Sequence, residues 1–218
     1  MIDWEGIDTV LLDMDGTLLD LHFDNYFWQT LVPSYFAKKE GLPLADAKLQ
    51  LEPIFKSQEG LLNWYCLDYW SDRLGVDIVA LKLQYQGGIK ELPETREFLH
   101  AVKQAGKYCV LVTNAHVESL VIKMQKTGLI EFFDAMVSAH DLGYPKEQQN
   151  FWRELYKLER FNKSKTIIID DSLSVLKAAD TFGVGHLVAV TQPDTTLPPR
   201  LVHEFVAVKN LSEIQPTL

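Results

Sequence analysis

Apolar residues recur along this 218-residue chain with two different periods, and each period predicts a different element. The short, nearly unbroken apolar run over residues 7–13 is typical of a strand that is buried on both faces of a parallel sheet. From Leu18 to about Gln86 the apolar residues instead follow the three- and four-residue spacing of amphipathic helices. In this segment we predict helices over residues 25–40, 43–56, 63–74 and 76–84.

Beyond Gly87 and Gly88, strand-like and helix-like patterns alternate. We predict strands over residues 108–112, 135–138, 166–169, 186–190 and 205–208, and helices over residues 93–105, 116–126, 146–159 and 173–182. This alternation indicates βαβ units, so the predicted fold class is α/β, with a Rossmann-like, doubly wound parallel sheet. The glycine pair is a plausible hinge. We therefore predict a catalytic core of residues 1–19 and 88–218, and a helical cap of residues 20–87 inserted after the first strand.

Groups with catalytic potential lie just past the ends of three predicted strands. Because the carboxyl ends of parallel strands share one edge of a sheet, we expect these side chains to converge. Lys146, at the start of a predicted helix, joins them. The strand-end residues are Asp13, Asp15, Thr113, Asn114, Asp170 and Asp171.

These residues have the chemistry needed to move a phosphoryl group. The Asp13 carboxylate could attack phosphorus and form an aspartyl-phosphate. Asp15 could protonate the leaving oxygen and later activate water. The Thr113 hydroxyl and the N–H groups at the start of the following helix could hold phosphoryl oxygens. Lys146 could supply a positive charge to the phosphate and to Asp13.

The predicted cofactor is Mg²⁺, because Asp13, Asp170 and Asp171 form an all-oxygen ligand set of the kind that this cation prefers. Each group also has an ordinary structural alternative. Thr113 with Asn114, or Asp170 with Asp171, could simply cap the helices that follow. Lys146 could be a solvated surface charge.

Composition and charge narrow the classes of partner. The formal net charge of −9 argues against a nucleic-acid-binding surface, which needs a basic footprint. We find no stretch of about 18 apolar residues and no signal-peptide pattern at the N-terminus, and so expect no membrane partner and a cytoplasmic location. Cys66 and Cys109 are not expected to form a disulfide framework or a zinc site. The oligomeric state stays open.

The four groups of residues together resemble the motifs of the haloacid dehalogenase superfamily of Mg²⁺-dependent phosphatases, and the helical insertion resembles its C1 cap. The resemblance implies that Asp13 is the nucleophile and Asp15 the acid–base residue. It also implies that the metal is held by the Asp13 side chain, the Asp15 backbone carbonyl and an acid of the last motif. The motifs are Asp13-Met14-Asp15-Gly16-Thr17, Thr113-Asn114, Tyr144-Pro145-Lys146-Glu147 and Ile169-Asp170-Asp171-Ser172.

One position departs from the pattern of the superfamily. Many relatives carry a further acid or Asn where this chain has Val175. Asp170 and Asp171 are therefore the expected pair of metal-binding acids, and which of the two binds directly stays open.

A narrower resemblance, to nucleotidase members of the superfamily that act on purine nucleoside monophosphates, rests on residues 20–28, 62–71, 113–116 and 143–147. It implies a phosphomonoester hydrolase with a small phosphorylated substrate. Trp64 and Tyr65 would stack on the base, and Asn25, Asp24 or Asn63 would bind its polar edge.

Several alternatives stay open at this point. The chain could be a phosphatase or a phosphomutase that acts on a sugar phosphate or another small phosphorylated metabolite. A dehalogenase is disfavoured by Asp15, and a non-catalytic binding protein is disfavoured by the intact motifs. His116 could contact substrate or be a surface residue of the first helical turn. His140 belongs to no motif and is expected to be structural.

Overall fold

The computed structural model describes residues 2–216. Within them, six parallel strands form one sheet in the order β3-β2-β1-β4-β5-β6, which confirms the predicted α/β class. The order changes direction at β1, which pairs with β2 on one side and β4 on the other. Such a switch opens a crevice beyond the carboxyl ends of the central strands. The strands are β1 (Thr9–Leu12), β2 (Tyr108–Thr113), β3 (Ala135–Ser138), β4 (Thr166–Asp170), β5 (His186–Val190) and β6 (Val206–Val208).

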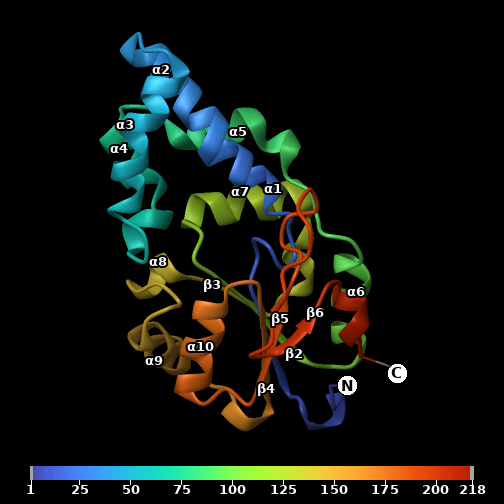
Figure 1. Ribbon diagram of the computed structural model, residues 1–218. Helices are drawn as coiled ribbons and strands as arrows, with labels where there is room; N and C mark the ends of the chain where they lie inside the picture. The colour runs from blue at the N-terminus through green and yellow to red at the C-terminus, as the bar shows by residue number, and fades with distance from the viewer. Residues whose placement is uncertain (1, 217–218) are drawn as a thin grey trace.

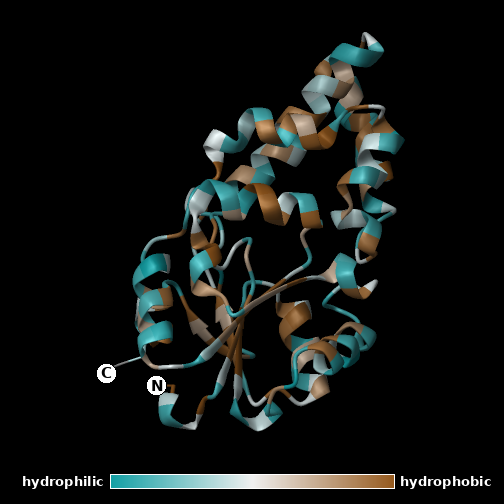
Figure 2. Ribbon diagram, turned by 180° about the vertical axis from the view of Figure 1, so that it is seen from behind, coloured by the Kyte–Doolittle hydropathy of each residue, from teal (hydrophilic) through white to brown (hydrophobic). Residues whose placement is uncertain are grey.

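Helices cover both faces of the sheet (Figure 1). Successive residues of a strand point to opposite faces, so Val10 and Leu12 belong to one buried cluster and Leu11 to another. Figure 2 shows largely apolar strands in the interior and helices in which apolar and polar residues alternate along the chain. The first cluster includes residues of α6 (Thr95–Gln104) and α7 (Val117–Thr127), and the second includes residues of α9 (Gln149–Leu158) and α10 (Leu173–Phe182).

The segment of residues 20–87 is helical, as predicted, and Figure 1 shows it gathered at one end of the molecule. Its helices are α1 (His22–Tyr26), a π-helical turn (Phe27–Leu31), α2 (Val32–Glu40), α3 (Leu44–Lys56), α4 (Leu67–Leu74) and α5 (Ile78–Tyr85). Short 3-10 turns occupy Trp4–Gly6, Leu62–Tyr65, Gln86–Gly88, Leu129–Phe132, Lys163–Lys165 and Leu211–Ile214. None of the helices described between residues 2 and 216 is long and apolar enough to cross a membrane.

The two connections to this helical segment lie side by side. The Asp20 N–H donates to the Lys90 carbonyl at 2.9 Å, and the Leu92 N–H donates to the Leu18 carbonyl at 2.9 Å. Paired connections of this kind are what a hinge at Gly87 and Gly88 would require. The division into a core and a cap at these boundaries stays a prediction.

Apart from shifts of a few residues at element ends and the π-helical turn within the predicted helix 25–40, the structure differs from the predicted elements in three places. The predicted helix 63–74 is interrupted at Cys66, whose backbone is extended and whose Sγ accepts a hydrogen bond from the Tyr69 N–H at 3.4 Å. The prediction that Lys146 begins a helix was wrong, because α9 starts at Gln149 and Lys146 lies in the preceding loop. The helix α8 (Ala139–Leu142) was missed because four residues are too few to show a period.

The close approach of β5 to the turn before β4 can be tested at Gly185. A Cβ added there would lie 2.7 Å from the Ser164 carbonyl oxygen, a backbone atom that cannot swing aside. We therefore expect Gly185→Ala to lower the free energy of unfolding by about 1–3 kcal/mol, the usual cost of overpacking, as measured by urea denaturation. The matched control is Gly87→Ala, whose new Cβ would meet no other described atom within 4 Å and should change stability by less than about 0.5 kcal/mol. Equal losses would contradict the close approach.

Candidate active site

A pocket of about 440 Å³ lies between the carboxyl ends of the central strands and the helical segment. One wall is polar and comes from strand ends and the loop before α9. The opposite wall is largely aromatic and comes from the helical segment. The structure thus brings the predicted strand-end residues to one place. The polar wall includes Asp13, Asp15, Thr113, Asn114, Lys146, Asp170 and Asp171, and the other includes Asn25, Trp28, Phe55, Trp64, Tyr65 and Trp70.

Lys146 connects the two central strands through their acids. Its Nζ donates to Asp13 Oδ1 at 2.5 Å and to Asp170 Oδ2 at 2.7 Å. The loop that carries Lys146 is fixed from both sides, because its N–H donates to Asn114 Oδ1 at 2.9 Å and its carbonyl accepts from Trp152 Nε1 at 2.7 Å. Lys146 is only 2% exposed, so the alternative of a solvated surface charge does not hold.

Burial dominates the protonation of these groups. It raises the pKa of Asp13 to about 7 and also raises the pKa of Asp170, although the charge of Lys146 opposes both changes. Burial disfavours the Lys146 ammonium, but Asp13 and Asp170 together hold its pKa above the usual value. The pKa of Asp171 is raised well above its usual value by burial and then by Asp170 and Asp13. One ammonium group therefore lies among three mutually repelling acids.

Three of these acids fit a divalent cation. Carboxylate oxygens of Asp13, Asp170 and Asp171 lie within 4.8 Å of one another, and a set of hard oxygen donors suits Mg²⁺. Gly16 permits the approach, because it has φ +85° and an added Cβ would lie 2.7 Å from Asp171 Cγ. The Asp15 side chain is not part of this group, so Asp15 would reach a metal only through its backbone.

Asp15 is instead held by a buried lysine. Lys123 Nζ donates to Asp15 Oδ1 at 2.6 Å and to Asp24 Oδ2 at 2.6 Å. Lys82 Nζ donates to the other Asp24 oxygen at 2.7 Å. Lys82 and Lys123 are 2% and 1% exposed. A chain of alternating charges therefore runs from Asp15 on the sheet side to α5 in the helical segment.

This chain of charges gives the two acids opposite properties. Burial raises the pKa of Asp15 to about 6, with Lys123 opposing it. Asp24 is also subject to burial, but Lys123 and Lys82 outweigh it and lower the pKa of Asp24 below its usual value. Asp15 can therefore hold a proton near neutral pH, as a general acid must. Asp24 is ionised and bound by two lysines, so it is poorly placed to bind the polar edge of a purine base.

Sequence reasoning missed both of these lysines. A signal was present, because Lys123 follows Leu120 by three residues and Lys82 follows Ile78 by four, so each lies on the apolar face of its helix. A lysine at such a position must find a buried partner or reach to the surface. The sequence alone does not identify that partner.

Asn114 and Glu147 connect the sheet side of the pocket to the opposite wall. Asn114 Nδ2 donates to Glu147 Oε2 at 3.1 Å, and the Tyr65 hydroxyl donates to Glu147 Oε1 at 2.9 Å. Burial and the neighbouring Glu147 raise the pKa of Tyr65, so its hydroxyl keeps its proton. The Thr113 hydroxyl accepts from the Ala115 N–H at 3.0 Å. Asn114 therefore holds the Lys146 loop rather than capping α7.

The predicted base-binding residues fall into two groups. Trp64, Tyr65 and Asn25 line the pocket, and Asn25 Nδ2 also donates to Asp194 Oδ2 at 2.8 Å. Asn63 is exposed, bonds to Gln58 and is not among the lining residues.

Comparison with known proteins agrees with this fold and site. Residues 7–183 match the model of the haloacid dehalogenase-like hydrolase family, and the chain belongs to this family. It is 40% identical over 217 residues to the GMP/IMP nucleotidase YrfG of Escherichia coli (strain K12), across 100% of this chain and 98% of that protein.

The chain is also similar to more distant proteins. The chain is 24% identical over 203 residues to a phosphorylated carbohydrates phosphatase of Thermotoga maritima, across 84% of this chain and 85% of that protein. The crystal structure of a HAD phosphatase from Thermococcus onnurineus superposes with a TM-score of 0.82 at 18% identity, over 95% of this chain and 96% of the other. This structural similarity shows that the two chains share the same fold.

The buried pairing of Lys123 can be tested by removing its charge. Lys123→Met would leave Asp15 and Asp24 without their shared cation in a site that is largely removed from water. We expect a loss of about 3–5 kcal/mol in the free energy of unfolding, measured by urea denaturation. The control is Lys126→Met on the exposed side of the same helix, which should cost less than about 0.5 kcal/mol. A Lys123→Met variant as stable as the control would show that the pairing contributes little.

Proposed function

We propose that this protein is a cytoplasmic, Mg²⁺-dependent 5′-nucleotidase that removes phosphate from purine nucleoside monophosphates such as GMP and IMP. The observation that carries the proposal is the single pocket in which Asp13 and Asp15 face an aromatic wall. Its volume of about 440 Å³ falls within the range of about 300–1,000 Å³ typical of small-molecule sites. The 40% identity to the GMP/IMP nucleotidase along the whole chain supplies the substrate class.

In the first half-reaction an oxygen of Asp13 attacks phosphorus. A bond forms between Asp13 and phosphorus while the bond from phosphorus to the ribose 5′ oxygen breaks. Asp15 gives its proton to that leaving oxygen, as its raised pKa allows. The Thr113 hydroxyl and backbone N–H groups at the start of α7 hold the phosphoryl oxygens.

In the second half-reaction Asp15 takes a proton from water. The water oxygen forms a new bond to phosphorus, the bond to Asp13 breaks, and the Asp13 carboxylate is regenerated. Lys146 keeps Asp13 oriented throughout, through the contact at 2.5 Å.

Bound Mg²⁺ would offset the repulsion between the Asp13 carboxylate and the phosphate. Asp13, the backbone carbonyl of Asp15, and Asp170 or Asp171 would hold it. Both oxygens of Asp170 already accept hydrogen bonds, from Lys146 at 2.7 Å and from the Ser172 N–H at 2.8 Å. The Asp171 carboxylate lies 3.7 Å from Arg200. This difference favours Asp171 as the direct ligand.

A second substrate class has one observation in its favour, the 24% identity to a phosphorylated carbohydrates phosphatase. A phosphatase or phosphomutase acting on sugar phosphates would use the same polar wall. The aromatic side of the pocket favours a flat, apolar group instead, because purine rings stack on aromatic side chains.

The test is phosphate release from a panel of nucleoside monophosphates and sugar phosphates. We expect GMP and IMP to be the best substrates, EDTA to abolish turnover, and added Mg²⁺ to restore it. Hydrolysis of sugar phosphates with no release from nucleotides would overturn the proposed substrate class while leaving the chemistry intact.

Asp13→Asn should remove the nucleophile and one metal ligand while preserving the fold. Activity toward GMP should fall by several orders of magnitude, at about 1.4 kcal/mol of transition-state stabilisation for each factor of ten. The measurement is kcat, with circular dichroism to check the fold. Near-normal turnover would sink the assignment of Asp13.

Trp64→Ala tests the aromatic wall, because the Trp64 side chain lines the pocket while remaining 37% exposed. The KM for GMP and IMP should rise about 5- to 150-fold, equivalent to about 1–3 kcal/mol of lost stacking. The kinetics with a small phosphate ester, which does not reach this wall, should change little. Tyr26→Ala is the control, since Tyr26 is 46% exposed and lies outside the residues that line the pocket. If Trp64→Ala affects both substrates equally, the base is bound elsewhere.

A further inference from the structure

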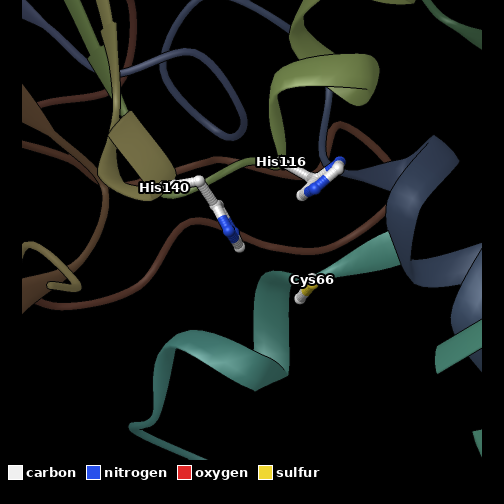
Figure 3. Close-up of side chains that lie close together, drawn as sticks. All are labelled: Cys66, His116 and His140. Atoms are coloured by element: carbon white, nitrogen blue, oxygen red, sulfur yellow. The ribbon is translucent and has the colours of Figure 1, made fainter. Parts of the chain in front are cut away.

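A second group of metal-ligating side chains lies apart from the acids. Figure 3 shows Cys66, His116 and His140 directed toward one another from three separate segments. Cys66 is the extended residue before α4, His116 directly precedes α7, and His140 belongs to α8. One potential ligand atom from each residue lies within 4.8 Å of those of the other two.

Two ring nitrogens of this group lack hydrogen-bond partners within the described chain. His116 Nδ1 and His140 Nε2 are buried and make no hydrogen bond among residues 2–216. The two rings meet nearly at right angles, with their centroids 4.8 Å apart. Buried polar atoms are normally paired, so two orphaned imidazole nitrogens beside a thiol need a physical reason. A bound cation would supply one.

We propose that Cys66, His116 and His140 bind one Zn²⁺ ion, which ties the segment before α4 to the sheet side of the molecule. One sulfur and two imidazole nitrogens are typical zinc ligands and suit Mg²⁺ poorly. The fourth position belongs to water, because the Asp68 carboxylate lies 3.7 Å from His116 Nε2 and not beside the unpaired Nδ1.

The geometry and protonation of the group are compatible with this ligand set. Bonds of about 2.0–2.3 Å place tetrahedral zinc ligands roughly 3.3–3.8 Å apart, so the side chains need to move inward by only about 1 Å. Cys66 would release its proton to solvent on binding.

The site would fix one wall of the active-site pocket. Cys66 lies between Tyr65 and Leu67, both of which line the pocket, and His116 lines it as well. A metal at this point would hold the aromatic wall against the start of α7. The proposal revises two expectations drawn from the sequence, that Cys66 has no part in a zinc site and that His140 is merely structural. The expectation about zinc considered only the two cysteines. The group in the structure contains one cysteine and two histidines that are far apart in the sequence.

The experiment is a titration of the full-length protein with Co²⁺ in excess Mg²⁺, followed by absorption spectroscopy. We expect one equivalent of Co²⁺ to produce a sulfur-to-cobalt charge-transfer band in the near ultraviolet, and Zn²⁺ to displace it. The acid cluster offers only oxygen, so it cannot produce this band. The readout needs no substrate and is therefore independent of the proposed function.

Two pairs of variants make the test specific. Cys66→Ser keeps a side chain able to accept from the Tyr69 N–H and should abolish the band, whereas Cys109→Ala should retain it. His140→Ala should weaken Zn²⁺ binding at least about a hundredfold, beyond the roughly 10- to 100-fold typical of losing an outer-shell partner. The exposed His203 supplies the control, His203→Ala. Circular dichroism of each metal-free variant checks its fold.

The opposite results would overturn the proposal. These are the absence of a charge-transfer band in the wild-type protein, a band that survives in Cys66→Ser, or equal Zn²⁺ affinity in His140→Ala and His203→Ala.

Discussion

The ammonium group of Lys146 lies between Asp13 and Asp170, and without it two carboxylates from adjacent strands would face each other away from water. Two like charges at such a separation cannot both persist in a site of low polarity unless a cation lies between them. The need for this cation explains the structure around it. Asn114 and Trp152 fix the Lys146 loop, because each forms a hydrogen bond with the backbone of Lys146.

Asp15 depends on a different cation, and through it on the helical segment. Lys123 bonds to both Asp15 and Asp24, and Asp24 comes from α1 and is paired with Lys82 of α5. If the helical segment moved and carried Asp24 and Lys82 away, Lys123 would pair with Asp15 only. The pKa of Asp15 would then fall, because Asp15 would be less buried and the repelling charge of Asp24 would be gone. The pKa of Asp15 would thus be coupled to the position of the segment that covers the pocket.

The sequence predicts those features of the site that depend on the local pattern of apolar and polar residues. Apolar runs identified the strands, and parallel topology explains why Asp13, Thr113 and Asp170 meet at one edge. The parts that it does not predict depend on distant partners. Nothing local shows that Lys123 will meet Asp15 and Asp24, or that the helix will be interrupted at Cys66. His140 lies in a helix too short to have a period, so its approach to His116 becomes visible only in three dimensions.

The charged side chains around the pocket carry an excess of negative charge, which a divalent cation would offset. Asp13, Asp15, Asp24, Asp170 and Asp171 are matched by Lys82, Lys123 and Lys146, which leaves an excess of two negative charges when all are ionised. Arg200 lies 3.7 Å from Asp171, but its side chain is 46% exposed and therefore well screened. The whole chain is also negative, at −9, so its long-range field repels a phosphate ester. One divalent cation among Asp13, Asp170 and Asp171 would cancel the local excess and present positive charge where a phosphate must bind. The same carboxylates that make the metal-free site unfavourable to an anion are therefore what would make the metal-bound site receptive to one.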